Sequence, residues 1–124
     1  MKTENMEKKT IGAIEAKFAD LVWENAPMTT SELIKRCNDE FNWKRTTTYT
    51  VLKKFCDGEI FKMENSKVEV VVTRDEFYSS QSAYFIDEKF NGSLPSFIAA
   101  FTRKRKLTKE EAEEIYSIIE SYTE

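Results

Sequence analysis

Apolar residues recur along this chain with two different periods. Over most of its length they lie three and four positions apart, the spacing that places them on one face of a helix. Between residues 60 and 72 the period changes to two, as in a strand with one buried face. The pattern predicts helices over residues 11–24, 29–39, 44–56, 73–90, 93–101 and 108–122, and strands over 60–63 and 67–72.

Capping and breaking residues mark the ends of these helices. Thr29, Thr73 and Thr108 are each followed three positions later by Glu, the pattern of an N-terminal capping box. Ala26-Pro27 ends the first helix, because the residue before a proline is pushed out of the α region. Asn91-Gly92 ends the helix that begins at residue 73. The inward face of the first helix is expected to comprise Ile14, Phe18, Leu21 and Val22.

The helix over residues 44–56 has two contrasting faces and contains no acidic residue. Small hydroxyl side chains let a helix enter a groove of DNA, and flanking cations meet phosphates. This pattern is typical of a recognition helix. The apolar face comprises Thr48, Val51, Leu52, Phe55 and Cys56, and the opposite face Arg45, Thr46, Tyr49, Thr50 and Lys53.

Three short helices followed by a hairpin form a winged helix-turn-helix. The hairpin, with its turn at Glu64-Asn65-Ser66, is the wing. We therefore expect a mainly α protein with a small β wing. The DNA-binding domain is expected over residues 10–72, and a helical dimerisation region over residues 73–124.

The charge is distributed unevenly. The chain has 124 residues, 40% of them hydrophobic and 13% aromatic, enough to build a globular core. Its net charge is −3, yet residues 41–67 hold six Lys and Arg against three acids. Residues 107–124 hold one Lys against six Glu. This asymmetry favours nucleic-acid contact by the basic segment.

Several kinds of chemistry lack the residues they need. The chain has no His, which excludes Ser/His and Cys/His nucleophiles, and two cysteines without His do not supply the four ligands of a structural zinc site. The three glycines are scattered, so no phosphate-binding loop is present. We expect no catalytic residue, no metal and no cofactor. Without a signal peptide or an apolar span, a cytoplasmic location is expected.

The helices after residue 73 carry more apolar surface than they can cover among themselves. Exposed apolar faces of this kind usually meet a partner subunit. A homodimer is therefore expected. The residues assigned to the dimer interface are Phe85, Phe97, Phe101, Ile115, Ile119 and Tyr122.

The order of these segments resembles the penicillinase and methicillin-resistance repressors. Leu21-Val22-Trp23-Glu24 and the segment from Met28 to Leu33 are similar to the first two helices of that family. Trp43, with the run from Thr46 to Phe55, is similar to its recognition helix. This sequence has Thr48 where the family usually has Val and Lys54 where it has Arg. Two further segments, Val72–Glu76 and Phe90–Leu94, resemble the start of the dimerisation part and the break within it.

The resemblance implies a homodimeric repressor bound to a palindromic operator. Family members are released when a membrane receptor protease triggers their cleavage, typically between Asn and Phe. The matching bond here is Ala100–Phe101, with Ala in place of Asn. Cleavage there, by a membrane receptor protease or by another protease, is the implied route of inactivation.

Specific DNA contacts can be assigned to side chains. Arg45 is expected to make a bidentate contact with guanine, and the threonines to touch base edges or thymine methyls. Two alternatives remain: a winged-helix module that binds protein, and a winged-helix regulator gated by a small ligand. The expected base contacts are Arg45, Thr46, Thr47 and Thr50, and the expected phosphate contacts Thr30, Ser31, Lys44, Lys53, Lys54 and Lys67.

Overall fold

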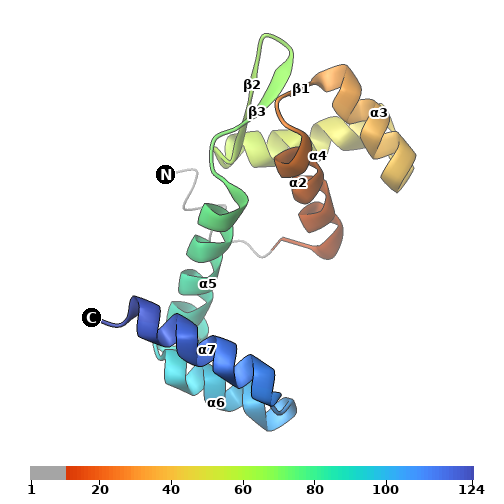
Figure 1. Cartoon of the computed structure of the whole chain (residues 1–124). Coiled ribbons are helices and arrows are strands. Elements are labelled where there is room, and N and C mark those ends of the chain that lie inside the picture. Colours follow the sequence, from red (N-terminus) through yellow and green to blue (C-terminus); the bar gives the residue numbers. More distant parts are fainter. Residues whose placement is uncertain (1–10) are drawn as a thin grey trace. The chain divides into compact units, whose positions relative to one another are not determined.

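The computed structural model describes residues 11–124, so residue 10, the first of the predicted DNA-binding domain, lies outside the described part. The chain divides into two compact units between Tyr84 and Phe85, inside a long helix. The elements in chain order are α2 (Ala13–Asn25), β1 (Met28–Thr29), α3 (Thr30–Phe41), α4 (Arg45–Asp57), β2 (Phe61–Glu64), β3 (Lys67–Val70), α5 (Arg74–Phe90), α6 (Leu94–Lys104) and α7 (Lys109–Tyr122) (Figure 1).

Local hydrogen bonds explain where the helices begin and end. The hydroxyl of Thr29 accepts from the backbone N–H of Glu32 at the start of α3. Asn42 ends that helix in the left-handed region, with a φ of 56°. Asn tolerates this conformation better than most residues, which suits a sharp turn into α4. The capping boxes predicted at Thr73 and Thr108 both form, each with reciprocal bonds to Glu three residues later.

The three strands form one antiparallel sheet in the order β1-β3-β2. Asn65 and Ser66 both have positive φ, the geometry of a two-residue type I′ hairpin turn. The wing was predicted correctly, although its second strand ends at Val70 rather than at residue 72. The third strand was missed. β1 has only two residues, too few for a visible alternation, and it pairs Met28 with Val68.

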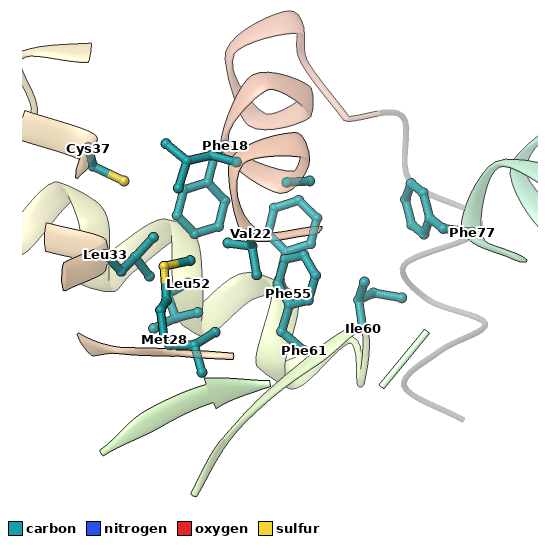
Figure 2. Close-up of a cluster of buried hydrophobic side chains, with 13 residues drawn as sticks. Phe18, Val22, Met28, Leu33, Cys37, Leu52, Phe55, Ile60, Phe61 and Phe77 are labelled. Atoms are coloured by element: carbon teal, nitrogen blue, oxygen red, sulfur yellow. The ribbon is translucent and has the colours of Figure 1, made fainter. Parts of the chain in front are cut away.

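The core of the first unit is built from its sheet and from every helix that the structure describes in it (Figure 2). Phe18 and Phe55 are fully buried and their ring centroids lie 5.6 Å apart. Burying such a side chain stabilises the fold by about 1.5–3 kcal/mol. The indole of Trp23 donates to the backbone oxygen of Val72 at 2.9 Å, which fixes the exit from the wing against α2.

One detail of the predicted packing was wrong, and one residue of the core was not predicted. Ile14, expected to face inward, is 47% exposed, because it lies in the first turn of α2, outside the packed core. Val51 and Cys56, predicted on the apolar face of α4, are half-buried and pack against the core. Phe77 of α5 is 1% exposed and belongs to the core of the first unit. The first unit therefore needs the beginning of α5, beyond the predicted domain boundary at residue 72.

The second unit comprises the end of α5 together with α6 and α7. Its rings make edge and tilted contacts: Phe97 lies 6.0 Å from Phe85 and 5.5 Å from Phe90, centroid to centroid. Ser93 caps α6 by accepting from the backbone N–H of Ser96. Neither α6 nor α7 contains a buried residue. This unit has local order and aromatic contacts but no closed core.

Candidate nucleic-acid interface

The two faces predicted for α4 differ in their solvent exposure. Thr48, Leu52 and Phe55 point into the core, as expected. Acidic side chains are absent from the first turn of the helix, so its positive end carries no local carboxylate. The exposed side chains of this helix include Arg45, Thr46, Thr47, Thr50 and Lys53.

The residues predicted to read bases lie together on the first half of α4. The guanidinium of Arg45 lies 5.6 Å from the centroid of the Tyr49 ring, a cation–π contact that holds the arginine along the helix. The hydroxyl of Thr50 donates to the backbone oxygen of Thr46 at 2.9 Å. Its proton is thus occupied, while its methyl group and oxygen lone pairs remain available to a ligand.

The two lysines predicted to hold phosphates at the end of α4 have different surroundings. Lys53 is exposed, and its ammonium lies 2.7 Å from the carboxylate of Asp57. Lys54 is half-buried, and its ammonium lies 2.6 Å from Oε2 of Glu15 in α2. The hydrogen bond from Lys54 lowers the pKa of Glu15 below its usual range. Lys54 thus connects α4 to α2, whereas Lys53 stays at the surface.

The start of α3, predicted to bind phosphate through Thr30 and Ser31, is tied to the wing. The backbone N–H of Thr30 donates to the carbonyl oxygen of Ser66 at 3.0 Å. Ser31 is exposed. The carboxylate of Glu32 accepts from the Thr29 hydroxyl at 3.2 Å, which places a negative charge in the same first turn. The helix start therefore positions the wing as well as offering polar groups.

The wing carries two lysines, both opposite acids across the hairpin. Lys67 is exposed and is paired in register with Glu64. Lys62 lies 3.2 Å from Oε2 of Glu64 and 3.5 Å from Oε2 of Glu69. The hydrogen bond with Glu64 is the main cause that raises the pKa of Lys62. Charge on the wing is thus largely compensated within the hairpin.

A groove of about 330 Å³ lies between α4 and β2. Tyr49 and Lys53 line it on the helix side, Lys62 and Met63 on the strand side. An exposed recognition helix beside a hairpin with lysines on both elements matches the geometry of a winged-helix DNA-binding surface.

Comparison with known proteins identifies the family. A sequence model of the penicillinase repressor family matches residues 11–121. The chain belongs to the penicillinase repressor family. It is 24% identical over 116 residues to the "Penicillinase repressor" of Bacillus licheniformis, an alignment that covers 90% of this chain and 91% of that protein. The predicted resemblance and the winged-helix fold class are confirmed.

Membership of this family gives the chain the role of a DNA-binding transcriptional repressor. The family is regulatory and not a family of enzymes. Within residues 11–124, no group of His, Cys, Asp and Glu is arranged to hold a metal ion. Over the same residues, no helix is both long and apolar enough to cross a membrane. The individual DNA contacts of the repressor remain predictions.

The predicted dimerisation residues of the repressor lie in the second unit, most of them at its surface. Phe97 and Ile115 are half-buried. The predicted cleavage bond lies within α6, where Ala100 is half-buried. The exposed fractions of the other four residues are 46% for Phe85, 38% for Phe101, 52% for Ile119 and 85% for Tyr122.

The carboxylates that pair with the lysines were missed by sequence reasoning. The pair of Lys53 and Asp57 could have been found, because oppositely charged residues four positions apart on a helix are neighbours. Glu15 and Lys54 are 39 residues apart in sequence and share no pattern, so only the packing of α2 on α4 brings them together. The ion pair of Lys62 with Glu69 likewise depends on strand register, which brings the two residues opposite each other.

One polar group in the core of the repressor has no hydrogen-bond partner. The hydroxyl of Thr48 is buried and unpaired in the described part of the chain. The thiol of Cys37 is close enough to this hydroxyl to be affected by it. Burial is the main cause that raises the pKa of this thiol, and Thr48 acts in the opposite direction. Cys37 and Cys56 are both free thiols.

Proposed function

We propose that the repressor binds a palindromic operator as a homodimer, with α4 of each protomer in the major groove. The observation that carries this proposal is the exposed, acid-free first half of α4, opposite a face buried in the core. Arg45 reads guanine, and Thr46, Thr47 and Thr50 meet base edges or thymine methyls. The proposed phosphate contacts are Lys44, Lys53, Lys67 and the start of α3 at Thr30 and Ser31.

The sequence predicts that Lys54 contacts phosphate, but the proposed interface does not use it in this way. Its ammonium is held at 2.6 Å by Glu15 on the side of α4 that faces α2. A phosphate contact by Lys54 would leave the half-buried Glu15 carboxylate without its partner, which costs free energy. Lys54 therefore orients α4 on α2, and Lys53 makes the phosphate contact.

The homodimer is proposed to form through the apolar surfaces of the second unit. These include Phe101 of α6 and Ile119 and Tyr122 of α7, all exposed in the single chain. Two-fold symmetry would bury the same surface on both subunits, as in most dimers. It would also present two recognition helices to half-sites about one helical turn, or a multiple of it, apart.

Release from DNA is proposed to follow cleavage of the Ala100–Phe101 bond by a protease, such as a membrane receptor protease. The bond lies inside α6, which has no buried residue and so can open locally more easily than the helices of the core. A cut would separate α7 from the rest of the second unit and remove its share of the dimer surface. The repressor would act in the cytoplasm, where both DNA and such a protease are accessible.

Binding of defined DNA tests the interface. Genomic fragments retained by the purified repressor supply the operator, and a random duplex of equal length supplies the reference. Arg45→Ala should weaken operator binding by about 1–3 kcal/mol and random binding little. Lys53→Ala should weaken both and reduce the salt dependence of binding. If neither substitution changes binding, α4 is not the DNA surface.

Induction in cells tests the release mechanism. The repressor is expressed with its genomic neighbours, cells are exposed to a β-lactam, and the chain is followed by mass spectrometry. A fragment ending at Ala100 is expected to appear as target transcripts rise. Induced transcripts with an intact repressor would exclude cleavage as the switch.

A further inference from the structure

The two lysines that line the groove between α4 and β2 are already paired with carboxylates of the same chain. The ammonium of Lys53 lies 2.7 Å from Oδ2 of Asp57, one helical turn later. The ammonium of Lys62 lies within 3.5 Å of both Glu64 and Glu69. The positive charge of the groove is thus compensated before any DNA arrives.

The ion pair of Asp57 with Lys53 contributes little to fold stability. Asp57 is the last residue of α4, where the helix dipole is negative and a carboxylate is unfavourable. Its ion pair with Lys53 is exposed, at 76% for the lysine side chain and 58% for the aspartate. Such exposed pairs contribute little to stability. The two effects have opposite sign.

A paired lysine is a weaker ligand for a phosphate than a free one. To reach DNA, Lys53 must exchange one ion pair for another, and the carboxylate of Asp57 then stands close to the phosphates and repels them. The same holds for Lys62 with Glu64 and Glu69 on the wing. Binding without sequence preference depends almost entirely on such phosphate contacts. Contacts of Arg45 and the threonines with bases are not affected.

We propose that Asp57, with Glu64 and Glu69, weakens the sequence-independent binding of DNA by the repressor, because Lys53 and Lys62 must leave these carboxylates to reach phosphates. This inference rests on the proposed function of α4 and the wing as the DNA surface. It assigns Asp57 a role in setting the affinity for DNA that requires no contact with a base. Tight binding then requires the base contacts of α4, since phosphate contacts alone are partly cancelled.

The test compares Asp57→Asn with the wild-type chain on the retained genomic fragment and on a random duplex of equal length. Removing the carboxylate should strengthen random binding severalfold at low salt and steepen the salt dependence by up to about one unit. Operator binding should strengthen by a similar factor, because the phosphate contact of Lys53 does not depend on base sequence. The double variant Lys53→Ala/Asp57→Asn should lose this gain, because the released cation is absent.

Two further variants separate the proposed effect from others. Asp87→Asn makes the same change of charge in α5 of the second unit and should leave both affinities unchanged. Glu69→Gln releases Lys62 on the wing and should act in the same direction as Asp57→Asn, which keeps the proposal testable if Asp57→Asn folds poorly. Thermal unfolding of each variant shows whether it is folded.

Each outcome has a distinct meaning. If Lys53→Ala weakens DNA binding but Asp57→Asn and Glu69→Gln change neither affinity nor salt dependence, the inference is wrong and the proposed function stands. An equal gain from Asp87→Asn would mean that net charge, not the ion pairs of the groove, sets the affinity. A wild-type chain that retains no genomic fragment would count against the proposed function and this inference together.

Discussion

The two units of the repressor use their aromatic residues differently. In the first unit Phe18, Phe55 and Phe61 are buried among three helices and the sheet. In the second unit the rings touch one another, yet neither α6 nor α7 contains a buried residue. A closed core stabilises a chain by itself, whereas an open apolar surface is stable only when another surface covers it. From this difference we predict that the first unit folds alone and that the second is covered by the partner proposed above.

The largest expected effect concerns the closed core. Phe55→Ala should lower the free energy of unfolding by about 3–5 kcal/mol, because its fully buried ring leaves a cavity. Phe97→Ala, in the half-buried cluster of the second unit, should cost less and by an amount that depends on protein concentration. Urea unfolding at several concentrations measures both. If both substitutions lowered the free energy of unfolding by the same amount, and independently of protein concentration, the two units would not differ in the way proposed.

The next prediction concerns where the first unit ends. A fragment of residues 11–84 should fold as a monomer, since it retains Phe77 in the core. A fragment of residues 11–72 loses that ring and should be less stable by about 3–5 kcal/mol, the usual cost of deleting a buried aromatic side chain. Circular dichroism with thermal unfolding compares them. If the two fragments were equally stable, the first unit would end at residue 72, as the sequence predicts.

A charge placed on the open surface should separate the subunits. Ile119→Asp, at a position that is 52% exposed in the single chain, should dissociate the homodimer and weaken operator binding at least about tenfold, or about 1.4 kcal/mol. Lys109→Asp, on the same helix but outside its apolar face, is the matched control. Sedimentation velocity measures the oligomeric state. A wild-type chain that is already monomeric at micromolar concentration would refute the proposed dimer.

A smaller effect is expected inside the core. Thr48→Val replaces a buried hydroxyl that has no hydrogen-bond partner by a methyl group of similar shape. The free energy of unfolding should rise by about 1 kcal/mol, because the cost of burying an unpaired polar group is removed. Thr47→Val, at an exposed position of the same helix, is the control. A destabilised Thr48→Val variant would indicate that the contact with Cys37 has stabilising value.

The smallest expected effect depends on pH. Lys54 lowers the pKa of Glu15 in the folded chain, so their ion pair stabilises the fold above the unfolded pKa of Glu, about 4.3. That contribution is lost as the pH falls through the lowered, folded pKa. Glu15→Gln should therefore cost up to about 1 kcal/mol near neutral pH and nothing in acid. A loss that is independent of pH would show that the charge of the Glu15 carboxylate does not carry the effect.

Several features of the fold could be predicted because their signals are local. Glu76 and Glu111 complete capping boxes three residues after threonine, and hydrogen bonds across one turn need no tertiary context. The change of period after Gly58 located the wing. By contrast, β1 is stabilised by β3 rather than by its own two residues, so no local pattern could reveal it.

In the candidate site, too, some features could be predicted from the sequence and others could not. The exposed and buried faces of α4 follow from helical spacing, and the structure places Thr48 and Leu52 inside as predicted. The different roles of Lys53 and Lys54, which are adjacent in sequence, could not be predicted. They depend on which carboxylate each ammonium meets, Asp57 on the same helix or Glu15 on another.

The sequence by itself determined the order of helices, the wing, the recognition helix with its acid-free first turn and the family to which the repressor belongs. Those properties depend on residue type and short-range spacing. The tertiary structure decided that Phe77 belongs to the first core, that Thr48 is buried without a partner, and which lysines are paired. Burial and ion pairing are set by groups distant in sequence, because a side chain's free energy depends on its neighbours in space.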